Sequence, residues 1–220
     1  MTADQKNCYH DNRLCRTHGR LFLKREFYIL TGQPGYFWGY SMADFIRTYT
    51  GKHYIPSEPD PALFCIEDFA HALPLLCRGN GHVKTFWSVG EHCILCAKEA
   101  AARGLSSRMV LACLLHDACE CYLSDVPRPF KKGMKEYQVL EEQTLDLIYI
   151  KYLGSVLSEH EKKLLKEIDD AMLWYDLKYL LDGENIGPQP KIHVTVNYAF
   201  RSFEEVEKEY LELYRKYQIV

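Results

Sequence analysis

The segment Leu114–Glu120 places His116 directly beside Asp117 within an otherwise apolar stretch. Folding buries an apolar stretch, and burying an imidazole next to a carboxylate is costly unless both groups are compensated. A divalent metal ion compensates both, because it accepts the imidazole nitrogen and neutralises the carboxylate. We therefore expect the fold to bring further ligands to this pair. His92, upstream, and Asp169, downstream, could complete the set.

From Glu67 onward, apolar residues recur at helical spacing almost throughout. Ser106 is a suitable N-cap, Gly154 a suitable helix stop, and Ser158 opens a capping-box pattern. We predict helices over residues 67–77, 89–102, 106–122 and 135–153, a helix that opens at Ser158 and contains Asp169, and a last helix over 199–217. The predicted fold class is all-α, a helical bundle formed by residues 51–220.

Residues 1–50 differ from the rest, and we predict an irregular N-terminal arm with one short helix near residues 42–49. The arm carries the aromatic group Tyr36, Phe37, Trp38 and Tyr40. This group could pack over the domain, contact a partner subunit or cover a binding site, so a homodimer stays open. We expect the arm to lie outside the catalytic core.

The composition limits the cellular compartments and the classes of partner that we expect for this chain. With 220 residues and a net charge of -3, the chain gives no electrostatic argument for a nucleic-acid or membrane partner. No apolar run reaches the ~18 residues that span a bilayer, and Met1–Lys6 lacks a signal-peptide pattern. An odd number of cysteines, nine, favours a reduced, cytoplasmic protein. We interpret Cys93 and Cys96, a C-x-x-C pair, as core thiols.

Polar residues are concentrated around the His–Asp pair. His116 and Glu120 are four residues apart, and Asp117 and Glu120 are three apart, so a single helix would place them on adjoining parts of one face. Asp125 follows just before a proline-rich turn. The alternative is a core histidine satisfied by a neighbouring carboxylate, but a solvated surface explains this cluster poorly.

These motifs resemble the HD-domain phosphohydrolase superfamily, whose signature is His … His-Asp … Asp, and most closely its bacterial 5'-deoxynucleotidase-like branch. The resemblance covers the chain from about Thr48 to the C-terminus. It rests on Ser88–His92, on His116–Glu120 continuing to Asp125–Lys131, on Asp169, and on Ile66–Leu73 leading to Arg78–His82.

The resemblance implies one divalent metal ion and a set of residues around it. The implied protein ligands are His92, His116, Asp117 and Asp169, with Asp170 as the rival of Asp169. Two imidazoles favour a borderline transition metal (Mn, Co, Fe, Ni or Zn) over magnesium. Glu120 would be the general acid or base or orient the water, and Asp125 would position the water or protonate the leaving oxygen. The phosphate-binding candidates are Arg78, His82 and Lys131.

The function implied is a metal-dependent phosphomonoesterase acting on (deoxy)nucleoside 5'-monophosphates, small-molecule substrates. Two cations and a metal suit a single dianionic phosphate better than a triphosphate. The alternatives are a dNTP triphosphohydrolase, another nucleotide phosphodiesterase, and a non-catalytic HD module that senses a nucleotide. The carboxylates Glu120 and Asp125 favour an enzyme, because a sensor has no need of proton-transfer groups.

Overall fold

The computed structural model describes residues 15–17, 20–22, 45–184 and 186–218. The chain divides into two compact units, Met1–Ala43 and Asp44–Val220. In the first unit, β1 (Cys15–Thr17) pairs antiparallel with β2 (Arg20–Phe22). The aromatic group at residues 36–40 lies outside the described residues.

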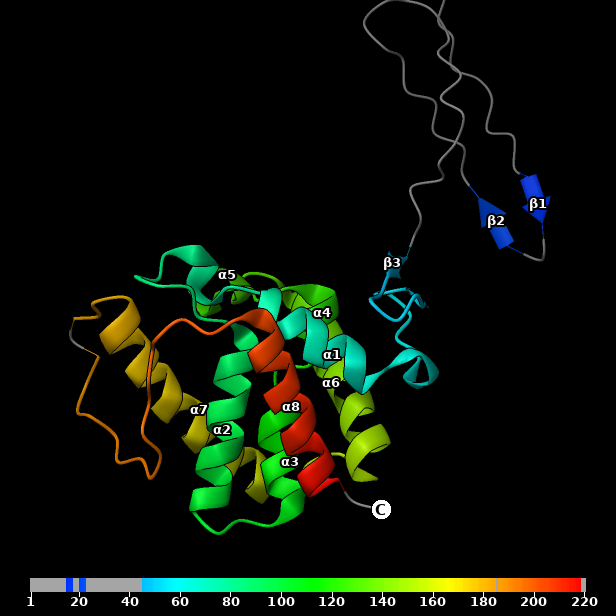
Figure 1. The fold of residues 1–220 in the computed structure, drawn as a ribbon. Coiled ribbons are helices and arrows are strands. Elements are labelled where there is room, and N and C mark those ends of the chain that lie inside the picture. Colours follow the sequence, from blue (N-terminus) through cyan, green and yellow to red (C-terminus); the bar gives the residue numbers. More distant parts are fainter. Residues whose placement is uncertain (1–14, 18–19, 23–44, 185, 219–220) are drawn as a thin grey trace, which may run out of the picture. The chain divides into compact units, whose positions relative to one another are not determined.

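The second unit is mostly helical, as the periodicity predicts (Figure 1). Its helices are α1 (Ile66–Ala72), α2 (Val89–Ala102), α3 (Ser107–Leu115), α4 (Glu120–Leu123), α5 (Arg128–Lys131), α6 (Lys135–Leu153), α7 (Glu159–Leu180) and α8 (Phe203–Tyr217). Short 3-10 helices lie at Pro61–Leu63, Leu73–Leu75 and Arg78–Gly81. Within the described part of the chain, no helix is long and apolar enough to cross a bilayer.

Capping residues set the helix ends where the sequence predicts them. Ser88 caps α2 and Ser158 caps α7, each through a complete capping box with the glutamate three residues later. Gly154 ends α6 in the left-handed conformation, with φ of 81°, which a glycine adopts without a steric penalty. The predicted bounds of α2 and α6 are confirmed.

The predicted helix over 106–122 is wrong in its second half. α3 ends at Leu115, and α4 begins only at Glu120. Between them the backbone bonds tighten, with Ala118 N donating to Leu115 O and Glu120 N to Asp117 O. The polar cluster therefore lies on a turn between two helices and not along one helix face.

Three other predicted elements differ from the structure. α1 ends at Ala72, and the chain continues as the 3-10 helix Leu73–Leu75, which contains Pro74. In place of a helix near 42–49, the described residues form the hairpin of β3 (Ile46–Arg47) and β4 (His53–Tyr54). The last helix begins at Phe203 and not at residue 199, because Ser202 forms its N-terminal capping box.

α3 lies at the centre of the bundle. Its residues from Met109 to Leu115 are all buried, and a helix that is apolar all round belongs in a core. It contacts α2, α6, α7 and α8. Tyr210 of α8 donates its hydroxyl hydrogen to the carbonyl oxygen of Leu114 at 2.8 Å. The chain that leaves α3 at His116 consequently starts inside the bundle, between α2 and α7.

Candidate functional site

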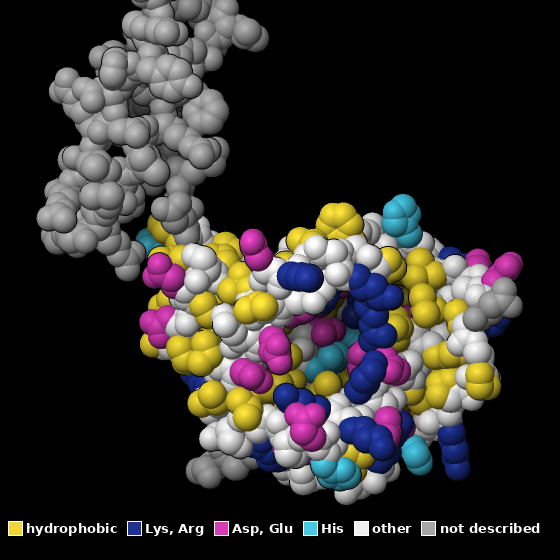
Figure 2. Space-filling view, turned by 180° about the vertical axis from the view of Figure 1, so that it is seen from behind, with side chains coloured by type: hydrophobic (Ala, Val, Ile, Leu, Met, Phe, Trp, Pro, Cys, Tyr) yellow, Lys and Arg dark blue, Asp and Glu magenta, His cyan; other side chains and the backbone are white. Residues whose placement is uncertain are grey.

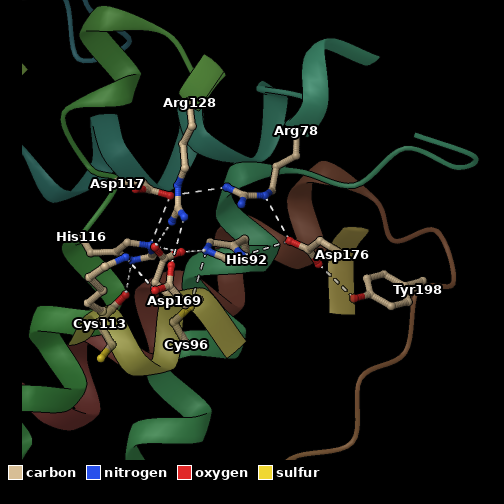
Figure 3. A network of polar contacts seen from close by, with 12 residues as sticks. Arg78, His92, Cys96, Cys113, His116, Asp117, Arg128, Asp169, Asp176 and Tyr198 are labelled. Carbon is tan, nitrogen blue, oxygen red and sulfur yellow. Dashed lines mark hydrogen bonds and ion pairs between the residues drawn. The ribbon is translucent and has the colours of Figure 1, made fainter. Parts of the chain in front are cut away.

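The four predicted ligands converge from three segments (Figure 3). His92 lies in the first turn of α2, His116 and Asp117 on the turn after α3, and Asp169 in the middle of α7. His92 Nε2 lies 3.1 Å from Asp169 Oδ1, and His116 Nε2 lies 3.8 Å from the same oxygen. His116 Nε2 also lies 3.2 Å from Asp117 Oδ2.

Hydrogen bonds at the far side of each ring orient the two histidines. His116 Nδ1 lies 2.8 Å from the carbonyl oxygen of Cys113, which can only accept, so Nδ1 carries the hydrogen. His92 Nδ1 likewise faces Asp176 Oδ2 at 3.2 Å. In its neutral form, each ring therefore presents the lone pair of Nε2 to the cluster, as in metal-binding histidines. Within the described residues, the buried Nε2 of His116 has no hydrogen-bond partner.

The structure distinguishes Asp169 from Asp170 as the candidate ligand, a choice that the sequence leaves open. Asp169 faces both imidazoles, whereas Asp170 accepts hydrogen bonds from Lys166 Nζ at 2.6 Å and from Arg128 at 3.0 Å. The Asp170 side chain is also 42% exposed, twice the value of Asp169. Asp169 is therefore the carboxylate in the geometry of a ligand.

The electrostatics of the cluster favour the charged forms of its imidazoles and carboxylates. Burial opposes the charged form of His92 and His116, but carboxylates beside the rings outweigh it and raise the pKa of both imidazoles well above its usual value. Burial also opposes ionisation of Asp117 and Asp169, yet the neighbouring imidazoles hold the pKa of both carboxyls below the usual range. A bound cation would satisfy the same carboxylates.

Glu120 and Asp125 lie beside the cluster and line the same cavity as Asp117. The Glu120 side chain is buried, and its Oε2 has no hydrogen-bond partner among the described residues. Burial, together with the charges of Asp117 and Asp125, raises the pKa of Glu120 well above its usual value. Burial also raises the pKa of Asp125. Both groups can therefore hold a proton at higher pH than an exposed carboxyl.

The predicted phosphate-binding residues do not all reach this site. Arg78 Nη1 lies 3.5 Å from Asp117 Oδ2, and Arg78 and Lys131 both line the cavity. His82 is exposed, and the cavity takes Gly79 and Val83 from its segment instead.

A cavity of about 560 Å³ opens in front of the ligand cluster. Figure 2 shows this face hollowed, with histidine and acidic side chains in its depth and Lys and Arg side chains along its rim. Aliphatic side chains line another part of the cavity, namely Val83, Leu173, Leu177, Leu180 and Leu181. The volume is in the range of small-molecule sites, ~300–1,000 Å³. The cavity can hold a ligand with one charged and one apolar part.

Sequence reasoning missed three residues at this site. Asp176 follows Asp169 by seven residues, two helical turns, so its place on the same face of α7 was readable from the spacing. Arg128 donates to Asp169 Oδ2 at 2.8 Å, and its position between two prolines just after Asp125 was the available signal. Cys96 is buried, as predicted for a core thiol, but its Sγ lies 3.6 Å from His92 Nε2.

The residues present fit a metal ion. His92, Cys96 and His116 hold their donor atoms within 4.8 Å of one another, and so do Cys93, His116 and Asp117. A borderline divalent metal requires oriented imidazoles and ionised carboxylates, and both are present. The buried Nε2 of His116, which has no hydrogen-bond partner among the described residues, is also free to bind an ion.

No family model matches the chain. It is 33% identical over 108 residues to the uncharacterized protein YfdR of Escherichia coli (strain K12), an alignment that covers 49% of this chain and 58% of YfdR. It is 34% identical over 130 residues to the uncharacterized protein RCAP_rcc00048 of Rhodobacter capsulatus, which covers 56% of this chain and 66% of that protein. Each alignment thus covers less than two thirds of the relative's own length.

Proposed function

We propose that this chain is an HD-domain phosphohydrolase, a metal-dependent phosphomonoesterase acting on (deoxy)nucleoside 5'-monophosphates. The observation that carries the proposal is the geometry of the two histidines. Their Nε2 atoms lie 3.1 and 3.8 Å from one carboxylate oxygen, Asp169 Oδ1, while each Nδ1 contacts an oxygen outside the cluster. A core histidine satisfied by its neighbours would not leave a buried ring nitrogen without a hydrogen-bond partner.

The residues that would hold the metal are His92, His116, Asp117 and Asp169. Two imidazoles and two carboxylates favour Mn, Co, Fe, Ni or Zn. When bound, such an ion lowers the pKa of a water molecule and polarises a phosphoryl oxygen. Four protein donors leave room for water and for one substrate oxygen.

The cations around the cavity would bind and orient the phosphate. Arg78 and Lys131 line the cavity, and Arg128 stands at its mouth with its guanidinium on Asp169. Arginine binds phosphate through two parallel hydrogen bonds, which fixes the orientation of the group as well as its position. Arg128 thus adds a third cation to the two that the sequence predicts at this site.

Glu120 would supply the proton of the reaction. Because burial and two neighbouring carboxylates raise its pKa, Glu120 would keep its proton to higher pH than an exposed carboxyl and give it to the leaving oxygen. Asp125, on the same cavity wall, would orient the water or share the proton transfer. The aliphatic wall formed by Leu173, Leu177 and Leu180 would take the apolar part of the nucleoside.

A phosphatase screen against a nucleotide panel, with Mn²⁺ or Co²⁺ added, tests this function. We expect release of inorganic phosphate from dAMP or a similar monophosphate, with little pyrophosphate or triphosphate from dATP. Triphosphate release from dNTPs, with monophosphates left intact, would assign a triphosphohydrolase instead. Nucleotide binding without any product would assign the non-catalytic sensing module.

A further inference from the structure

Asp176 lines the cavity and contacts side chains from three other segments of the bundle. It lies on α7, two turns after Asp169, and is only 4% exposed. Its Oδ2 lies 3.2 Å from His92 Nδ1 and 3.2 Å from Arg78 Nε, and its Oδ1 accepts the hydroxyl hydrogen of Tyr198 at 3.0 Å (Figure 3). One buried carboxylate thus contacts an imidazole, a guanidinium and a phenol.

We infer that Asp176 is a positioning residue: it orients both the metal ligand His92 and the phosphate-binding Arg78. The inference rests on the proposed function, because it assigns to His92 and Arg78 the roles given above. Asp176 is not one of the four proposed metal ligands, and it acts through the side chains that it orients.

The contact with His92 fixes the state of the ligand. Asp176 Oδ2 lies where it accepts the hydrogen of His92 Nδ1, and this contact turns Nε2 of the same ring toward Asp169. The carboxylate also makes the imidazole a stronger donor to a metal. Without Asp176, the His92 ring loses both its orientation and this support.

The contact with Arg78 keeps a buried cation in place. The Arg78 side chain is 14% exposed and, among the described residues, pairs with Asp176 at 3.2 Å and with Asp117 at 3.5 Å. Loss of Asp176 would leave Arg78 paired with Asp117 alone, and a guanidinium on a metal ligand competes with the metal. The same loss removes the partner that orients the guanidinium toward the cavity.

Tyr198 supplies the third contact, from the segment between α7 and α8. Its ring packs edge-on against Trp87, with centroids 4.8 Å apart. A separate carboxylate holds the same segment: fully buried Glu99 on α2 accepts the backbone N–H groups of His193 and Val194 at 2.8 and 3.1 Å. Glu99 therefore offers a matched control, a buried carboxylate that fixes this segment and does not line the cavity.

The experiment compares Asp176→Asn with the wild type and with Glu99→Gln by calorimetric titration of the metal-free proteins with Mn²⁺ or Co²⁺ alone. We expect Asp176→Asn to bind the metal about 10–100-fold more weakly, as for other residues that orient a metal ligand. With dAMP at saturating metal, its KM should rise at least about tenfold, because a charge-assisted contact to Arg78 is lost. Glu99→Gln should keep the metal affinity of the wild type.

The possible results distinguish the role of Asp176 from the proposed function of the chain. Wild-type metal affinity in a folded Asp176→Asn variant would overturn this inference and leave the proposed function intact. Equal weakening in Glu99→Gln would also overturn it, because the effect would then come from the segment as a whole. A wild-type protein that binds neither metal would overturn the proposed function together with the inference.

A second variant guards against a failure of Asp176→Asn to fold. Tyr198→Phe removes one hydroxyl group and keeps the ring against Trp87. Because the Tyr198 hydroxyl donates to Oδ1 of Asp176 and not to the Oδ2 that faces His92, we expect a few-fold loss of metal affinity, smaller than that of Asp176→Asn. Unchanged affinity in Tyr198→Phe, with Asp176→Asn unfolded, would count against the inference.

Discussion

Replacing Glu120 by glutamine separates proton transfer from metal binding. The substitution keeps the shape of a side chain that is 4% exposed, so it creates no void, but the amide can neither give nor take a proton. General acid–base assistance is worth about 10²–10⁴-fold, or about 3–5 kcal/mol of barrier. Because burial and the charges of Asp117 and Asp125 raise the pKa of Glu120 well above its usual value, we expect a loss of activity within that range.

The assay measures phosphate release from dAMP with Mn²⁺ across a range of pH, alongside the metal content of each protein. If Glu120 is the acid, the wild type should lose activity as the pH rises through the Glu120 pKa, because its proton is then gone. Glu120→Gln should lack this alkaline limb while keeping its metal. Glu99→Gln, which alters a buried carboxylate outside the cavity, should keep wild-type kcat. Full activity of Glu120→Gln would refute the reasoning, and loss of its metal would make Glu120 a ligand instead.

Two further predictions concern the metal and the stability of the bundle. His116→Ala should lose most of its divalent metal by elemental analysis, because it deletes an oriented ring nitrogen, and a metal content equal to the wild type would contradict the ligand set. Arg108→Met should lower the free energy of unfolding by about 1.5–3 kcal/mol, since Arg108 Nε donates to Glu161 at 2.7 Å. That hydrogen bond, together with the capping bonds from Ser158, lowers the pKa of Glu161 from its ordinary 4.5 to about 2, so this stabilisation is present above about pH 4.5 and is lost as the pH falls through about 2. Arg108 also donates to the carbonyl oxygens of Leu153, Ser155 and Val156, and these bonds do not titrate. Urea unfolding should therefore show the gap between wild type and Arg108→Met narrowing in acid, and a gap independent of pH would contradict the role of Glu161.

The sequence alone determined the elements whose signals are local. The N-cap at Ser106, the capping box at Ser158 and the left-handed Gly154 depend on contacts within a few residues, so they placed helix ends correctly. The apolar run before His116 likewise predicted a buried helix, because no polar residue interrupts it. The ligand set itself was an inference from resemblance and stays a prediction that the metal analysis tests.

The tertiary structure alone decided what depends on distant segments. The break after Leu115 follows from i to i−3 bonds and from His116 Nδ1 donating to the Cys113 carbonyl, neither of which changes the hydrophobic period. Asp169 and Asp170 have equal claims in the sequence, and only the packing of α7 against α2 and α3 turns Asp169 toward the histidines. Asp176 carries no local signature of its partners either, because Arg78, His92 and Tyr198 lie 98, 84 and 22 residues away along the chain. Local patterns thus specify where helices begin and end, whereas the protonation and orientation of the candidate ligands arise from contacts that only the folded bundle creates.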